Sequence, residues 1–207
     1  MPALVGNRQT NLPEEYRHAL FVDSNAFRVG GLENLAANNG EKFLRYLKTA
    51  AKQTDLGAIL LVLDGDHKKF EKAPFCQVTV ARLLAERAKQ AAAGEKFSFA
   101  VVFLLQEYES FLIASAAQFS LLKLGIELPP NAEDAPRDAK KWLRENLNGG
   151  YSEASQQVEL TRQISDWSAA QRMRSFQRFE NALLELSRAV AGNYHIVSPI
   201  LPVNASS

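Results

Sequence analysis

The fold is decided by one stretch, Ala58-Ile59-Leu60-Leu61-Val62-Leu63-Asp64-Gly65-Asp66-His67, in which an unbroken apolar run leads into an acidic turn. A run that is apolar at every position, rather than at alternate positions, is typical of a strand in a parallel sheet covered on both faces. We therefore expect a buried strand over 58–63. The two aspartates that follow it are expected at the carboxyl end of that strand, where open α/β sheets bind their ligands.

Further strands and helices alternate with this run through the first half of the chain. Residues 18–22 and 97–105 are short apolar runs typical of strands, whereas 41–53 and 78–93 place their apolar residues on one helical face. The order strand, helix, strand, helix, strand predicts an α/β fold with a parallel sheet, flanking helices and right-handed crossovers.

The second half of the chain is expected to be mostly helical. Helices are predicted over 108–124, 138–147 and 168–190, and the last of these has Ser168 and Gln171 as a capping box. A polar loop that contains proline is expected between the first two of these helices.

Length and composition indicate a soluble protein with one core. The chain has 207 residues, of which 46% are hydrophobic and 23% charged, and this is enough apolar material for a single domain. We expect that domain over 1–198, with a sheet-bearing part over 1–115 and a mostly helical part over 116–198. Residues 199–207 are expected to form a flexible tail.

Charge and cysteine content narrow the possible partners and compartments. The formal net charge is +1, so nothing draws the whole protein onto nucleic acid or an anionic membrane, and any such contact needs a local patch. Cys76 is the single cysteine, which rules out an internal disulfide and favours the cytoplasm. No signal peptide is visible, and no apolar run reaches the roughly 20 residues of a membrane helix, so no membrane partner is expected.

Acidic residues follow two of the predicted strands. Asp64 and Asp66 leave the first of them, and Glu107 and Glu109 leave the next. If these strands are neighbours, four carboxylates meet in one crevice, and that much like charge is costly unless a cation offsets it. Oxygen ligands favour magnesium or manganese over zinc. We therefore expect Asp64, Asp66 and Glu107 as metal ligands, and all four carboxylates as the catalytic group.

Ordinary explanations stay open for the same residues. Asp-Gly after a strand is also a common turn, and a pair of glutamates at the start of a helix is favoured by the helix dipole. His67 is a candidate ligand for a metal or a phosphate, and the alternative is a surface histidine at a strand exit.

Basic residues near the acidic turn are candidates for contacts with nucleic acid. Lys68 and Lys69 follow the turn directly. Arg28 precedes Gly30-Gly31, where the glycines allow a phosphate to approach the backbone closely. The alternative is that these side chains only solvate the surface, which the low net charge favours.

Several segments together give the chain a resemblance to a known family. They are Phe27-Arg28-Val29 before Gly30-Gly31, then Leu61-Val62-Leu63-Asp64-Gly65-Asp66, then Glu107-Tyr108-Glu109-Ser110-Phe111-Leu112, then Ala139-Lys140-Lys141-Trp142-Leu143 with Gly150-Tyr151-Ser152, and last Ser175-Phe176-Gln177-Arg178-Phe179. In this order and spacing they resemble the bacterial domain-of-unknown-function family four-two-seven-six, within the Toprim-like group. The resemblance covers nearly the whole chain.

The resemblance implies a Toprim-like α/β fold and a magnesium-dependent nuclease or phosphodiesterase. In that pattern the metal is held by an Asp-x-Asp pair, here Asp64 and Asp66. The acidic pair of the second motif is Glu107 and Glu109, and its aromatic position is Phe111. The resemblance further implies a hydrolase that acts on nucleic acid in phage defence with an ATPase partner. Whether the chain forms a homo-oligomer stays open.

One element that the resemblance implies is not visible in the sequence. Toprim-like chains open with a strand that ends in a Glu-Gly-x-x-Glu-like segment, whose glutamate is the proposed general acid or base. Met1 to Val5 resemble instead the helix that follows such a strand. A chain without this glutamate is expected to be a non-catalytic regulatory or assembly subunit of the same fold. Hydrolysis of a small phosphate ester is a third alternative.

Overall fold

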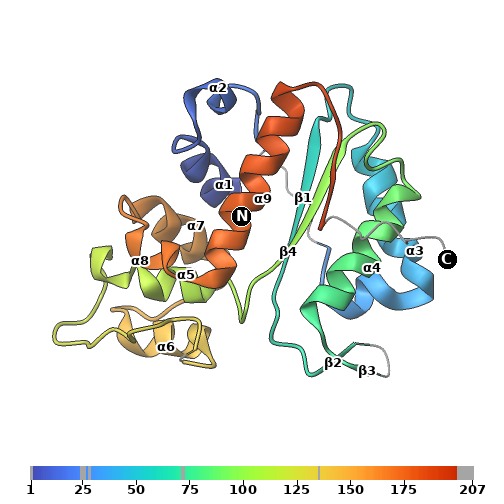
Figure 1. The fold of residues 1–207 in the computed structure, drawn as a ribbon. Helices are drawn as coiled ribbons and strands as arrows, with labels where there is room; N and C mark the ends of the chain where they lie inside the picture. The colour runs from blue at the N-terminus through green and yellow to red at the C-terminus, as the bar shows by residue number, and fades with distance from the viewer. Residues whose placement is uncertain (1, 24–26, 28, 71–72, 135, 200–207) are drawn as a thin grey trace.

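The sheet at the centre of the molecule has three parallel strands in the order β1-β4-β5 (Figure 1). They are β1 (Ala58–Leu63), β4 (Ser98–Phe103) and β5 (Val197–Ser198). The α/β class and the parallel sheet flanked by helices are thereby confirmed. This computed structural model describes residues 2–23, 27, 29–70, 73–134 and 136–199, apart from the side chains of 36–38.

The two long strands form where the apolar runs predicted them. β1 has the predicted limits, and β4 lies inside the run 97–105 and is buried along its whole length. The strands pair from Ala58 opposite Ser98 to Leu63 opposite Phe103. β4 is the middle strand, so both of its edges are paired, and its two faces pack against hydrophobic cores on either side, which suits an unbroken apolar run.

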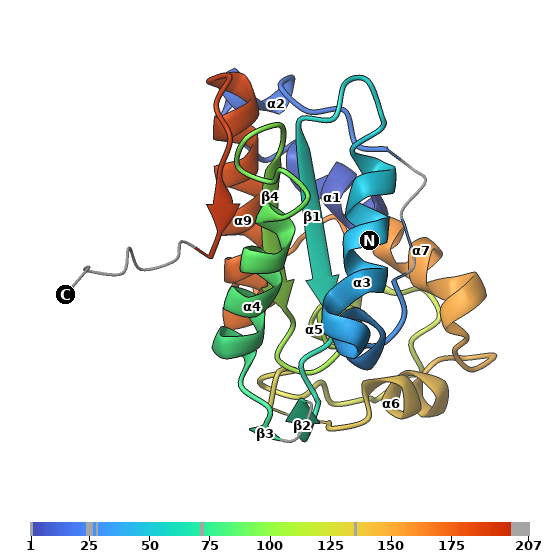
Figure 2. The same cartoon turned by 90° about the vertical axis from the view of Figure 1, so that its right-hand side faces the viewer.

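Helices cover both faces of the sheet, as Figures 1 and 2 show. One face is covered by α3 (Leu32–Ala50) and α4 (Gln77–Lys89), and the other by α9 (Arg174–Ala191) together with α1 (Pro2–Gln9). Successive residues of β4 point alternately into the hydrophobic cores on the two sides. The sheet therefore separates two hydrophobic cores, and loops lie at the ends of its strands.

Short elements complete the helical layer and the loops. They are α2 (Glu14–Arg17), the hairpin strands β2 (Lys69–Phe70) and β3 (Ala73–Pro74), α5 (Glu109–Ala114), the 3-10 helix η1 (Ala116–Gln118), α6 (Ala139–Asn146), α7 (Glu153–Gln163) and α8 (Ser168–Gln171). The third strand of the sheet comes after α9, from the part of the chain that is otherwise helical.

None of the helices in the described part of the chain has the length and apolarity that crossing a membrane requires. Of the predicted tail, residues 200–207 lie outside the described part of the chain.

The prediction of a strand over 18–22 is wrong. These residues follow α2 as a turn and an irregular segment, and the carbonyl groups of Arg17 and Leu20 accept hydrogen bonds from Nε2 of Gln9. The side chain of Phe21 is 95% exposed. A short apolar run becomes a strand only beside a partner strand, and in this segment the carbonyl of Leu20 accepts a hydrogen bond from a side chain instead.

The single helix predicted over 168–190 is two helices, α8 and α9. The second begins at Arg174 because a carboxylate distant in the sequence caps it. Glu133 accepts hydrogen bonds from the backbone N–H groups of Arg174 at 2.8 Å and of Ser175 at 2.6 Å. These N–H groups have no partner within their own helix, so the glutamate stabilises a helix start at this point.

Other helix limits also differ from the predictions. The capping box of Ser168 and Gln171 is wrong, because the N–H of Ser168 donates to Oδ1 of Asp166 at 2.8 Å. The helix predicted over 41–53 begins at Leu32, directly after the glycine pair. The helix predicted over 108–124 is shorter, since α5 gives way to a 3-10 turn.

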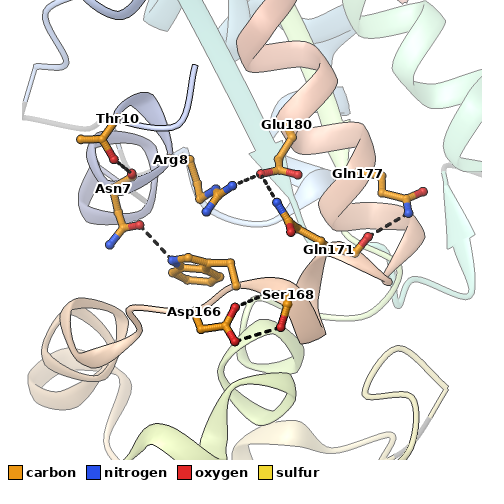
Figure 3. Close-up of polar contacts among 9 residues, drawn as sticks. Asn7, Arg8, Thr10, Asp166, Ser168, Gln171, Gln177 and Glu180 are labelled. Atoms are coloured by element: carbon orange, nitrogen blue, oxygen red, sulfur yellow. Dashed lines mark hydrogen bonds and ion pairs between the residues drawn. The ribbon is translucent and has the colours of Figure 1, made fainter. Parts of the chain in front are cut away.

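Buried polar contacts join α1 to the C-terminal helices (Figure 3). Arg8 is 5% exposed, forms an ion pair with Glu180 and lies over the ring of Phe176 at 5.7 Å. Oδ1 of Asn7 accepts a hydrogen bond from Nε1 of Trp167 at 2.9 Å. The first helix is therefore part of the core, although its sequence is polar and weakly patterned.

Gly65 permits the close approach of the segments that leave β1 and β4. Its N–H donates to the carbonyl of Gln106 at 2.9 Å. A Cβ atom at this position would lie 2.1 Å from the carbonyl oxygen of Leu104 and 2.2 Å from Nε2 of Gln77. The first of these neighbours is backbone, so only a glycine fits here without a shift of the strand ends.

We predict that Gly65→Ala lowers the free energy of unfolding by about 3 kcal/mol, because the added methyl group must separate the two strand exits. Urea titration of the variant and the parent protein measures the difference. Gly6→Ala in α1 is the matched control, since its added Cβ meets nothing within 4 Å and alanine favours a helix. Equal stability of the two variants would contradict the prediction.

Candidate functional site

The candidate site lies at the carboxyl ends of β1 and β4. The last residues of the two strands, Leu63 and Phe103, are partners in the sheet. Asp64 follows the first strand directly, and Glu107 and Glu109 follow the second within a few residues. Because parallel strands end at the same edge of a sheet, the acids of two separate segments reach one region.

Lys140, near the start of α6, supplies the positive charge of this region. Its Nζ lies 3.3 Å from Oε2 of Glu107, 3.2 Å from Oε2 of Glu153 and 4.0 Å from Oε2 of Glu109. Its backbone N–H also donates to Oε1 of Glu107 at 3.2 Å. We call these four residues the Lys140 cluster.

The carboxylates of the Lys140 cluster keep its lysine charged. Partial burial by itself would lower the pKa of the ammonium group. The negative charges of Glu109, Glu107 and Glu153 outweigh that effect and raise the pKa of Lys140 above its usual value. The ammonium group is therefore a permanent cation at this edge of the sheet.

Glu109 is fixed in the interior by two side-chain hydrogen-bond donors. It is 1% exposed, and its Oε1 accepts hydrogen bonds from the hydroxyl group of Tyr151 at 2.7 Å and from Nε2 of Gln157 at 3.3 Å. Burial raises the pKa of Glu109, and the hydrogen bond from Tyr151 and the charge of Lys140 oppose the rise. Burial, with the nearby Glu109, also raises the pKa of Tyr151, so this hydroxyl group remains a donor.

Asp64 shares the electrostatic environment of the Lys140 cluster. The side chain of Asp64 is exposed at the surface. The surrounding protein nevertheless displaces much of the water that would hydrate its carboxylate, and this loss of hydration raises the pKa of Asp64 to about 6. The charge of Lys140 opposes the rise. Three carboxylates add to it, in the order Glu109, Asp66 and Glu107. The strand exits thus bring acids of both segments within range of each other's charge.

The two residues at the end of the acidic turn have different surroundings. Asp66 is exposed. His67 has its Nδ1 3.8 Å from Oε1 of Glu33, at the start of α3, and its ring meets the ring of Phe75 edge-on at 5.3 Å between centroids. These contacts account for the position of His67 as a packed surface histidine.

Of the basic residues predicted to contact nucleic acid, the structure describes Lys68 and Lys69, which lie just beyond the acidic turn. Lys68 and Lys69 are both exposed, and Lys69 opens the hairpin of β2 and β3. Arg28 lies outside the described residues. A role of these side chains in binding phosphates stays a prediction.

The acids of the site do not fit a divalent metal ion as they are arranged around Lys140. Within the described part of the chain, no three side chains of the types His, Cys, Asp and Glu form a group that could hold a metal. The ammonium group lies against Glu107 and Glu109, so these two carboxylates already have a cation beside them. The predicted roles of Asp64, Asp66 and Glu107 as ligands of magnesium or manganese stay predictions.

Lys140, Tyr151 and Gln157 were not predicted as site residues. The first two lie in segments that carry the family resemblance, but nothing in their spacing relates them to the acids. Lys140 lies 33 positions from Glu107, and Gln157 lies 48 positions from Glu109. The one local signal was the pair of lysines at the predicted start of a helix, and a solvated helix face has the same pattern.

Comparisons of the chain with known protein families, with curated proteins and with solved structures each find no match. The resemblance to a Toprim-like family therefore rests on the motifs quoted above.

We predict that Asp64→Asn stabilises the protein at pH 8 and not at pH 3.5. The pKa of about 6 in the folded state lies above the ordinary value of 3.8, so the folded state holds the proton more tightly. The resulting stabilisation is complete below the ordinary pKa and is lost as the pH rises through 6. Asparagine does not ionise, so the variant does not lose this stabilisation. We expect its free energy of unfolding at pH 8 to exceed that of the parent protein by on the order of 1 kcal/mol, because solvent screens an exposed carboxylate.

Urea titrations of the parent protein and the variant at the two pH values measure this difference. A stability difference that is the same at both would show that Asp64 ionises as in an unfolded chain.

Proposed function

We propose that the chain carries a Toprim-like domain that acts on phosphodiester bonds of nucleic acid at the site of Asp64, Glu107 and Glu109. The observation that supports the proposal is the meeting of these acids at adjacent ends of two parallel strands. That edge is where open α/β sheets bind ligands. A role in phage defence in the cytoplasm, together with an ATPase, belongs to the same proposal because the resemblance implies it.

The side chains of the site are suited to proton transfer and to holding charge. Asp64 is in contact with solvent, and a carboxyl group with a pKa of about 6 exchanges protons near neutral pH, as general acid–base catalysis requires. Glu109 is buried and fixed by Tyr151, so in this proposal it positions Lys140 rather than reacting. Magnesium or manganese stays part of the proposal, but with Lys140 in its observed place no step is assigned to the ion.

A second candidate is a non-catalytic regulatory or assembly subunit. The observation that favours it is the neutralisation of the acids from within the chain, since Lys140 forms ion pairs with three carboxylates. Such a cluster is also a way to hold α6 and α7 against the strand ends. The partner in this case would be an ATPase or a second copy of the chain.

We predict that the protein cleaves labelled DNA or RNA in millimolar magnesium or manganese, and that Asp64→Asn lowers the rate about 100-fold, as the loss of a proton-transfer group does. Gel assays with single-stranded and double-stranded DNA and RNA, with and without EDTA, measure cleavage. Glu145→Gln removes an exposed charge on α6 and is the control that is expected to cleave like the parent protein.

Intact nucleic acid under all these conditions would overturn the enzymatic proposal. A stable complex with an ATPase or a defined oligomer on a sizing column would then support the second candidate.

A further inference from the structure

We infer that Lys140 is a built-in counter-cation that competes with divalent metal ions for the carboxylates of the site. Removal of its charge is expected to create a binding site for Mn²⁺ or Mg²⁺ between Glu107 and Glu109. The inference concerns how the site is kept closed, and it rests on the proposed function for its biological role. Its test measures metal binding without nucleic acid, so the two can fail separately.

The negative charges around Lys140 outnumber its single positive charge. Its one ammonium group forms ion pairs with Glu107, Glu109 and Glu153, and its charge also acts on Asp64. Four carboxylates with no cation among them would repel one another strongly in a partly buried place. A divalent cation from solution is the compensation that oxygen ligands accept most readily. With an uncharged residue at position 140, the negative charge of these carboxylates is unbalanced, and a divalent ion can balance it.

Contacts that do not involve the lysine side chain also hold the carboxylates of Glu107 and Glu109. Oε1 of Glu107 is held by the backbone N–H of residue 140, which every substitution except proline retains. Oε1 of Glu109 is held by Tyr151 and Gln157. Loss of the ammonium group therefore removes the cation beside the Oε2 atoms of both glutamates, while the contacts of their Oε1 atoms remain.

The distances leave room for a metal ion in place of the ammonium group. Nζ lies 3.3 Å from Oε2 of Glu107 and 4.0 Å from Oε2 of Glu109. Bonds from magnesium or manganese to oxygen are roughly 2.0–2.2 Å, so these oxygens must close in by roughly 1–2 Å. Water molecules are available for the remaining positions, since magnesium commonly keeps several waters.

Lys141 provides a matched comparison. It is the next residue of the same helix and also carries an ammonium group, but its side chain is 62% exposed and pairs with the exposed Glu145 at 3.8 Å. The side chain of Lys140 is 33% exposed. If simple loss of positive charge on α6 attracted metal ions, both substitutions would act alike.

The experiment is a calorimetric titration of the full chain with Mn²⁺ in chelator-free buffer. We expect Lys140→Met to bind Mn²⁺ at least tenfold more tightly than the parent protein, with a rise in melting temperature on adding the ion. Lys140→Arg keeps the charge and is expected to bind like the parent protein, as is Lys141→Met. Adding Glu107→Gln to Lys140→Met is expected to abolish the gain.

Equal Mn²⁺ affinity of Lys140→Met and the parent protein, whether both bind or neither does, would overturn the inference. An equal gain in Lys141→Met would do so as well, because the effect would then be general to the surface charge. If Lys140→Met does not fold, as judged by its thermal transition, Lys140→Gln takes its place, with the same expected gain and the same overturning result.

Discussion

The parallel pairing of β1 with β4 is the constraint on which the rest of the structure depends. The strands run in register to Leu63 and Phe103, and the chain segments stay together beyond the sheet because the N–H of Gly65 bonds to the carbonyl of Gln106. Both segments therefore leave at the same edge, and the acids that follow them are held in one region. The crowding of negative charge at this edge is a direct consequence of how the strands pair.

The chain balances that charge with a lysine from a helix that is packed nearby. Lys140 joins three carboxylates and modifies the acidity of Asp64. An ammonium group offsets charge as a metal ion does, but it has protons where an ion has open coordination positions, so it cannot activate a bound water molecule. The acids of this edge are therefore neutralised from within the chain, by a group that takes no part in water activation.

Buried polar contacts fix the helical layer around this edge. Nε2 of Gln106, just beyond β4, donates to the backbone carbonyl of Glu133 at 2.6 Å, and the carboxylate of Glu133 caps α9. The ion pair of Arg8 with Glu180 joins α1 to the same helix. Buried polar groups require partners, so these contacts favour one arrangement of helices over others with similar apolar packing. The loops that carry the site are thereby attached to the rigid part of the fold.

The sequence by itself determined the two long strands and the acids at their ends. An unbroken apolar run of six or more residues is typical of a covered strand; Asp64 follows the first of these strands directly, and Glu107 follows the second within a few residues. Only the tertiary structure decided the short strand β5, the start of α9 at Arg174, which Glu133 caps, and the place of Lys140. A two-residue strand forms because β4 offers it a free edge, and a cap or an ion pair across many residues depends on how the chain returns to itself. Local periodicity records which face of a segment is buried, but it does not record which distant side chain that face will meet.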